Sequence, residues 1–391
     1  MAVSERYFFP RTTFIAWFVR GNDQLDAATR LKLLAGPFSS GMTLIAAGFS
    51  TLLICSVALY RHPIKIFMIW LCVDTIIWNV RLLLFRRCNA PTKPPLKYAT
   101  DLSLLLGLVW AAEIGAGTAA CIISGDPVLQ VLSSTLAVSL NGAIAMRNQG
   151  IPHYAFAQIL LTDIPLKFST LFQSEPMLMI LILQAPMYLG GLWILLKHFN
   201  SNLAKAYHAE AHSSYLANHD SLTGLLNRAG IFSMLRGLLK PSSQNPEHLA
   251  LLYFDLDGFK SINDSYGHAA GDKALTMFST LLNSNIRTND FAARLGGDEF
   301  IVVLRTDLEE HATLITERII KSIGEYRRTY DAFHGLGVSV GISLSDSAGT
   351  DTPETLLHRA DIALYQANWR VRDVIGMRSD DYLTLLPSCS A

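Results

Sequence analysis

The sequence is short of charge. Only 16% of its 391 residues are Asp, Glu, Lys or Arg, whereas 50% are hydrophobic, and 32 basic residues balance 32 acidic ones. A formal net charge of zero gives no basis for non-specific binding to nucleic acid, so an anionic ligand has to be held by a local site. The charged residues gather after about residue 200, which predicts a membrane half followed by a soluble half.

Cysteine is also scarce. The five cysteines are an odd number without the spacing of metal ligands, and three of them lie inside apolar runs. We therefore interpret them as buried thiols rather than as disulfides or metal ligands. They are Cys55, Cys72, Cys88, Cys121 and Cys389.

The first 40 residues lack the pattern of a cleaved signal peptide. Their apolar run, residues 14–19, is short, and no cleavage-site pattern follows a long apolar core. Basic residues stand on both sides of this run. We expect residues 1–40 to stay on the chain as a cytoplasmic segment.

Six apolar runs then follow, each of about 20 residues and so long enough for a helix to cross a bilayer. They lie at residues 41–60, 64–85, 102–123, 127–146, 153–173 and 176–197. Residues 41–197 are therefore predicted to form an all-α, six-span membrane module in contact with lipid. Basic residues after the second, fourth and sixth runs place both ends in the cytoplasm. The turn with Arg61 and Lys65 is an exception, because this topology places its basic residues outside.

Ionisable residues inside membrane spans are costly unless they pair or face a cavity. Asp163 and Lys167 stand four residues apart, so they can neutralise each other along one helix face. The others are Asp74, Arg81 and Glu113. Two interpretations stay open: a signal-sensing pocket among the helices, or structural pairs and snorkelling groups.

Residues 198–218 turn polar and alanine-rich, which predicts a helical linker that continues from the last run. From residue 219 the pattern becomes that of an α+β domain. Strands are expected at residues 249–254, 291–295, 299–304 and 338–344. Helices are expected near 228–239, 268–286, 307–329 and 353–368, and a short one begins at Gly258. The order β, α, β, β, α, β predicts an antiparallel sheet with a palm or ferredoxin-like core, backed by helices on one face.

Carboxylates follow the ends of two predicted strands. Asp255 ends the first strand, and Asp298 and Glu299 come directly after the glycine turn Gly296–Gly297. If the strands are neighbours, these side chains converge on a site suited to Mg²⁺, which proteins usually hold with one or two carboxylates plus substrate phosphates. The chemistry that follows is metal-assisted phosphoryl or nucleotidyl transfer. We expect Asp257 to cap the next helix instead.

Five motifs together resemble the GGDEF family of diguanylate cyclases over residues 219–376. They are DSLTGLLNR from Asp220, FDLDGFKSIND from Phe254, YGHAAGD from Tyr266, GGDEF from Gly296 and RADIALYQAN from Arg359. The resemblance implies a bacterial inner-membrane protein with a cytoplasmic catalytic domain that joins two GTP molecules into cyclic di-GMP. It also implies dependence on Mg²⁺, or on Mn²⁺ in its place.

The resemblance also assigns roles to single residues. Asp255, Asp298 and the backbone carbonyl of Leu256 are expected to bind the metal; Asp298 accepts the proton of the attacking 3′-hydroxyl and Glu299 assists. The glycines leave room for a triphosphate. The remaining substrate-binding residues are Asn263 and Asp272 at the guanine edge, His268 in the same set or as a helix cap, Phe259 and Lys260 at the phosphates, and Arg372.

The family reaction needs two domains face to face, so the resemblance implies a homodimer, with the membrane module and linker controlling how the domains meet. Arg287 and Asp290 have the spacing of the family's inhibitory product site. In that role they bind cyclic di-GMP; the alternative is a surface ion pair.

The last helix departs from the family pattern. Asn368 stands where a lysine usually holds the triphosphate, Val371 replaces a glycine, and Arg372 keeps its type. Losing a charge-assisted phosphate contact costs roughly 1.5–3 kcal/mol. The alternative hypothesis is therefore a weakened domain that acts as a cyclic di-GMP receptor. Residues 377–391 are expected to form a tail.

Overall fold

The computed structural model describes residues 9–19, 26–38, 41–90, 96–239, 248–306, 308–330, 333–346 and 350–372, without the side chains of 367–372. The chain divides into two compact units, residues 1–210 and 211–391. Each unit is described by itself.

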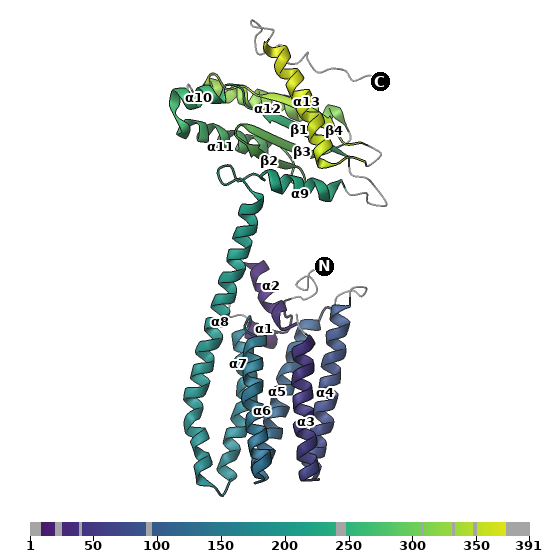
Figure 1. Cartoon of the computed structure of the whole chain (residues 1–391), viewed down its shortest axis with the longest axis vertical. Helices are drawn as coiled ribbons and strands as arrows, with labels where there is room; N and C mark the ends of the chain where they lie inside the picture. The colour runs from purple at the N-terminus through teal and green to yellow at the C-terminus, as the bar shows by residue number, and fades with distance from the viewer. Residues whose placement is uncertain are drawn as a thin grey trace. The chain divides into compact units, whose positions relative to one another are not determined.

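The described residues of the first unit form helices joined by turns, without strands (Figure 1). All six predicted apolar runs are mainly helical, and a helix satisfies the backbone hydrogen bonds of an apolar run within the run itself. The α-helices are α1 (Thr13–Val19), α2 (Ala27–Ala35), α3 (Gly41–Arg61), α4 (Lys65–Asn89), α5 (Ala99–Ile123), α6 (Pro127–Arg147), α7 (Pro152–Phe168) and α8 (Ile180–Asn218). Short 3₁₀ turns occupy Gly36–Phe38, Ser169–Phe172 and Pro176–Met179.

In the described part of the chain, five helical runs are long and apolar enough to cross a membrane, namely those that contain α3, α4, α5, α6 and α8. The fifth predicted run is divided between α7 and a 3₁₀ turn. The 17 residues of α7 extend about 26 Å at 1.5 Å per residue, short of a hydrocarbon core of about 30 Å. A sixth span therefore stays a prediction.

The helices of this unit pack closely through small residues. A Cβ placed at Gly117 of α5 would lie 1.9 Å from Trp70 of α4, and one at Gly48 of α3 would lie 2.0 Å from Trp78. Only glycine lets these indole rings approach the neighbouring helix so closely. Cys55, Cys88 and Cys121 are buried as predicted.

Cys72 does not fit that prediction, because it is exposed. It lies on α4, whose apolar residues are spread around much of its circumference, so an apolar run did not indicate which side faces the bundle. Cys389 lies outside the described residues.

Several ionisable groups of the first unit are paired. Lys167 Nζ lies 2.6 Å from the Asp163 carboxylate, as the four-residue spacing predicted. Arg61, which does not fit the rule that basic residues lie on the cytoplasmic side, donates to Asp126 at 2.5 Å. That hydrogen bond lowers the pKa of Asp126 to about 2, so the charge of Arg61 is offset locally.

The second unit contains a four-stranded sheet in the order β2-β3-β1-β4, in which every neighbouring pair is antiparallel. The strands are β1 (Leu249–Asp255), β2 (Phe291–Gly296), β3 (Glu299–Arg305) and β4 (Ser339–Leu344). The helices are α9 (Arg228–Leu238), α10 (Phe259–Tyr266), α11 (His268–Asn285), α12 (Glu309–Thr329) and α13 (Pro353–Arg372). The predicted order of strands and helices is confirmed.

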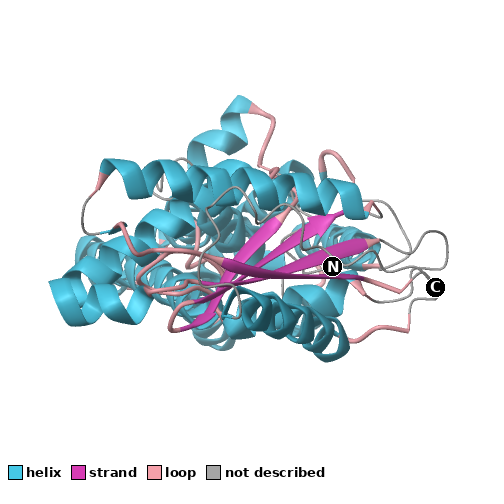
Figure 2. Ribbon diagram, turned by 90° about the horizontal axis from the view of Figure 1, so that it is seen from above, coloured by secondary structure: helices cyan, strands magenta, loops and turns pink. Residues whose placement is uncertain are grey.

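Helices cover both faces of this sheet, not one as predicted (Figure 2). Phe254, Phe278 of α11 and Ile319 of α12 belong to one core. Tyr253, Ile231 of α9 and Leu364 of α13 belong to the other. The signal was in β1 itself: its first six residues are all buried, and an unbroken apolar strand is typical of a sheet covered on both sides.

Candidate active site

Two carboxylates face each other where β1 ends and β3 begins. Asp255 and Glu299 are direct partners in the β1–β3 register. Side chains at directly opposite positions have Cβ atoms about 5 Å apart, and both residues lie on the face that carries Tyr253 and Ile301. The sequence prediction that these acids converge is therefore confirmed for this pair.

Asp298 lies beside the same strand end. The backbone N–H of Leu256 donates to the carbonyl of Asp298 at 3.3 Å, which holds the residue after β1 against the glycine turn. Gly296 and Gly297 have φ values of +153° and +53°. These backbone conformations favour glycine, because a Cβ is strained there.

Electrostatics mark these acids as a cluster. Burial raises the pKa of Asp255 to about 6, and the neighbouring charges of Asp298, Asp257 and Glu299 add to the rise. Like charges at this distance disfavour one another's ionised forms. A bound cation would relieve that repulsion, so the donor set fits a hard divalent ion. Within the described residues, no group of three or more His, Cys, Asp or Glu side chains is arranged to hold a metal ion by itself.

Arg294 of β2 holds the glycine turn in place. Its Nε and Nη2 donate to the carbonyl of Gly297 at 3.0 and 2.8 Å, and its Nη1 donates to the Asp220 carboxylate at 3.2 and 3.3 Å. Asp220 also accepts from the backbone N–H and hydroxyl of Thr223 at 2.9 and 2.6 Å. Burial alone would raise the pKa of Asp220, but these hydrogen bonds hold it below its ordinary value.

Sequence reasoning missed the role of Arg294. It lies two residues before the glycine turn and 74 residues from Asp220, and no spacing rule joins positions so far apart. The presence of Asp220 in the first motif was the only signal. Both residues thus hold the turn in position.

Asp257 does not cap α10, contrary to the prediction. The cap position is Gly258, in a left-handed conformation with φ +76°, and no side chain caps the helix. A Cβ at Gly258 would lie 2.3 Å from the carbonyl oxygen of Gly335, so the chain turns there through a residue without a side chain. Asp257 instead accepts a hydrogen bond from Ser339 Oγ at 2.9 Å and ties the end of β1 to β4.

The predicted guanine-binding residues lie on α10 and α11. Asn263 packs against Gly271, where a Cβ would meet Asn263 Oδ1 at 2.1 Å. This places Asn263 next to the helical turn that carries Asp272. Asp272 and His268 are exposed, as a substrate contact requires. Their roles toward guanine stay predictions.

The predicted phosphate-binding residues lie in different surroundings. Phe259 is partly buried and packs against the larger core of the domain, whereas Lys260 is exposed. Asn368 and Arg372 lie on α13, and their side chains are outside the described residues. The structure thus leaves the triphosphate contacts of the last helix as predictions.

Asp290 is buried, with 9% exposure, and holds backbone. Its oxygens accept from the N–H groups of Arg287 at 2.9 Å and Arg305 at 3.1 Å. The guanidinium of Arg287 is exposed, and the described residues show no ion pair between it and Asp290. The surface ion pair considered from the sequence is therefore not formed, and Arg287 is available to a ligand.

Residues 217–373 match a known protein family, described as "Diguanylate cyclase, GGDEF domain". The probable diguanylate cyclase DgcE of Escherichia coli is 42% identical over 153 residues, which are 39% of this chain and 14% of that protein. The response regulator PleD of Caulobacter vibrioides is 39% identical over 168 residues, 42% of this chain and 37% of PleD. The chain thus spans less than half the length of these relatives.

A further relative and a solved structure match a similar share of this chain. The diguanylate cyclase TpbB of Pseudomonas aeruginosa is 39% identical over 180 residues, which are 46% of this chain and 41% of TpbB. A solved GGDEF domain of TpbB is 38% identical, covers 39% of this chain and 89% of that domain, and has a TM-score of 0.35. The residues that match the family all lie in the second unit.

Proposed function

Because residues 217–373 form a GGDEF domain, we propose that the chain is a diguanylate cyclase that condenses two GTP molecules into cyclic di-GMP and two pyrophosphates. The observation that carries the proposal is the meeting of Asp255, Asp298 and Glu299 at the glycine turn. The names of the relatives DgcE and TpbB agree with it.

In this proposal the metal site consists of Asp255, Asp298 and the carbonyl of Leu256. When bound there, Mg²⁺ or Mn²⁺ would neutralise charge on the triphosphate and lower the pKa of the attacking hydroxyl. Asp298 accepts the proton of the 3′-hydroxyl, and Glu299 supports the same cluster. The turn at Gly296 and Gly297 lets the triphosphate approach the backbone.

Recognition of guanine is assigned to Asn263 and Asp272, with His268 beside them. An amide and a carboxylate together offer the donors and acceptors that match the guanine edge, so adenine would leave polar groups unpaired. Lys260 is assigned to the phosphates together with Phe259 and Arg372. The close packing of Asn263 on Gly271 supports this group, because it orients the amide.

Synthesis requires two GTP molecules in opposite orientation, since each 3′-hydroxyl attacks the α-phosphate of the other. One domain supplies half of that arrangement, so we propose a homodimer as the active form. Cyclic di-GMP is proposed to bind at Arg287 and Asp290 as an inhibitor. The buried, backbone-bonded Asp290 supports this because it fixes the loop from which the Arg287 side chain extends.

The proposed location is the bacterial inner membrane, with the GGDEF domain in the cytoplasm. The five long apolar helical runs support it, as does the excess of basic residues on one side. The signal that the membrane module receives would then reach the domain through α8, which runs unbroken from Ile180 to Asn218.

The test is synthesis by the purified full chain with GTP and Mg²⁺, followed by chromatography of the product. Cyclic di-GMP and pyrophosphate are expected in a ratio of one to two, and Asp298→Ala is expected to abolish both. A matched control, Glu310→Gln, removes an exposed acid on α12 and should leave synthesis unchanged. Tight binding of added cyclic di-GMP without any synthesis would instead identify a receptor.

A further inference from the structure

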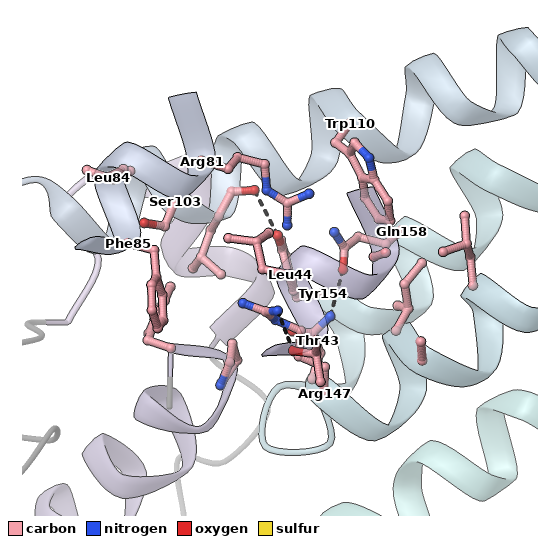
Figure 3. A pocket seen from close by; sticks show the side chains of 18 residues that line it. Thr43, Leu44, Arg81, Leu84, Phe85, Ser103, Trp110, Arg147, Tyr154 and Gln158 are labelled. Carbon is pink, nitrogen blue, oxygen red and sulfur yellow. Dashed lines mark hydrogen bonds between the residues drawn. The ribbon is translucent and has the colours of Figure 1, made fainter. Parts of the chain in front are cut away.

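The first unit contains a cavity of about 70 Å³, shown in Figure 3. It lies at the end of the bundle where α3, α5 and α7 begin and α4 and α6 end. Part of its wall is apolar, from side chains such as Leu44, Leu84, Phe85 and Trp110. Since a buried water needs roughly 10–15 Å³ by this measure, the cavity has room for more than one water molecule.

The charge of the cavity is of one sign. Among the described residues, its lining includes two cations, Arg81 and Arg147, and no acidic residue. The Arg81 guanidinium lies 4.8 Å from the centre of the Trp110 ring, and Arg147 donates to Thr43 Oγ1 at 2.7 Å. These two guanidinium groups give the lining a positive charge, which favours an anionic ligand.

The nearest acids form hydrogen bonds with other residues and not with Arg81. Asp74 and Glu113 lie within electrostatic range of it, but Asp74 accepts from Thr51 Oγ1 at 2.8 Å and Glu113 accepts from Trp70 Nε1 at 2.9 Å. In the part of the chain that the structure describes, no carboxylate forms an ion pair with Arg81. A guanidinium has five N–H donors, so this one has hydrogen bonds to give.

Tyr154 and Gln158 of the lining already have partners. The Tyr154 hydroxyl donates to the carbonyl of Leu104 at 2.9 Å. Gln158 donates to the carbonyl of Gly107 at 2.8 Å and accepts from Asn148 at 2.7 Å. Figure 3 shows Arg81 extending toward Tyr154 and Gln158. The unused donors therefore belong chiefly to Arg81, and a ligand that matches them offers hydrogen-bond acceptors.

We propose that this cavity binds the carboxylate or phosphate group of a small amphipathic molecule, with its oxygens on Arg81 and its apolar part against Leu84 and Phe85. The planar guanidinium fork suits both oxyanions, since each can accept two parallel hydrogen bonds. A free metabolite and a lipid headgroup offer the same chemistry. Of the two interpretations left open by the sequence, Asp163 and Lys167 are a structural pair, whereas Arg81 belongs to a ligand pocket.

The cavity adjoins the helix that leaves the bundle. Asn148, in its lining, is followed by Gln149 and Gly150, whose carbonyl oxygens accept from Asn200 Nδ2 of α8 at 3.0 and 3.1 Å. A ligand that shifts Asn148 would thus act on α8 through these two hydrogen bonds. Any effect of this ligand on catalysis rests on the proposed cyclase activity. Binding of the ligand to the cavity does not depend on that activity, so the test measures binding.

The test uses the full chain in nanodiscs of phosphatidylcholine and isothermal titration calorimetry. Hexanoate and hexyl phosphate are the anionic probes, and hexanol and hexylamine are the neutral and cationic ones. We expect saturable binding of an anionic probe that is at least about tenfold tighter than that of hexanol, because hydrogen bonds to charged groups contribute that much. Equal binding of hexanol would overturn the proposal.

Three variants locate the site. Arg81→Gln is expected to weaken anion binding at least about tenfold. Arg86→Gln, an exposed position on the same helix, is the matched control and should bind as the wild type does. Ser103→Leu fills the cavity while leaving Arg81 in place, and should also block binding. If Arg81→Gln fails to fold, Ser103→Leu still tests whether the anion binds in this cavity. Unchanged anion binding in Arg81→Gln or in Ser103→Leu would refute the site.

A final arm identifies the source of the anion. Replacing one-fifth of the lipid by phosphatidylglycerol should weaken hexanoate binding if a lipid headgroup occupies the cavity. Unchanged hexanoate affinity would support a free small molecule. Both results support an anion site, and absence of hexanoate and hexyl phosphate binding in every nanodisc contradicts it without affecting the proposed cyclase.

Discussion

Asp255, the last residue of β1, lies directly opposite Glu299, the first residue of β3. The antiparallel register thus places two acids side by side at the edge of the glycine turn. Such an arrangement costs free energy of folding when no cation is present, and that cost is the first property to test.

Replacing Asp255 by Asn should stabilise the metal-free chain and abolish the stabilising effect of Mg²⁺ with GTP. The free energy of unfolding is expected to increase by about 1 kcal/mol, because the raised pKa means that ionisation of Asp255 is unfavourable in the folded state. Partial exposure of the side chain to solvent limits the size of the effect. Chemical denaturation with EDTA, and again with Mg²⁺ and GTP, measures both changes. Equal stability of variant and wild type in EDTA would contradict the electrostatic argument.

The same carboxylate predicts a dependence of stability on pH. The pKa of Asp255 rises from 3.8 to about 6 on folding, so the folded state binds the proton more tightly than the unfolded state. Its contribution is present below about pH 4 and is lost as the pH rises toward 6. The difference in unfolding free energy between wild type and Asp255→Asn, measured from pH 4 to 7, should follow this course. A difference that stays constant with pH excludes it.

Arg294→Met should weaken both the fold and synthesis. The variant leaves the Asp220 carboxylate and the Gly297 carbonyl without the donors seen in the structure, which costs about 1–3 kcal/mol. Arg294→Lys keeps the charge but not the fork, so it should recover only part of the loss. Denaturation and steady-state kinetics measure the two effects, and full activity of Arg294→Met would show that the turn does not need this support.

The glycine turn offers a comparison of two glycines. Gly297 has φ +53°, so Gly297→Ala should destabilise the chain by about 1 kcal/mol and slow synthesis. Gly324 lies inside α12 with nothing within 4 Å of an added Cβ, so Gly324→Ala should stabilise it by about 0.5–1 kcal/mol. Thermal unfolding should move in opposite directions for the two; a shift of the same sign would contradict the assignment.

Arg287 and Asp290 should separate into two roles. Arg287→Gln is expected to retain stability and lose inhibition by added cyclic di-GMP, because its guanidinium is exposed. Asp290→Ala should lower stability by about 1–3 kcal/mol, since it leaves two backbone N–H groups without their acceptor. Product titration of the initial rate and denaturation distinguish the two. Inhibition that persists in Arg287→Gln would remove the proposed site.

Asn368→Lys should lower the KM for GTP. A lysine at this position would restore the cation that the family pattern places near the triphosphate, and a charge-assisted contact contributes roughly 1.5–3 kcal/mol, or about tenfold or more in affinity. Steady-state kinetics with GTP is the measurement, and Asn368→Gln is the neutral control. A KM unchanged by lysine would mean that another group serves the phosphates.

The sequence by itself determined the helices and strands of the second unit. Apolar runs and turn glycines predicted the strands and helices, because burial pattern and turn conformation are local properties. The same strand ends and glycine turn predicted that Asp255 and Glu299 meet. The long apolar runs likewise predicted helices in the first unit. Its Asp163–Lys167 pair was predictable, since four residues form one turn of helix.

Only the tertiary structure decided which distant residues meet. The link from Arg294 to Asp220 and the hydrogen bond from Ser339 to Asp257 join segments that no period in the sequence relates. The cavity with Arg81 and Arg147 but no acid is of the same kind. Such features depend on how whole helices and strands pack. The net charge of a cavity, for example, is the sum of the charges of side chains that several elements bring together.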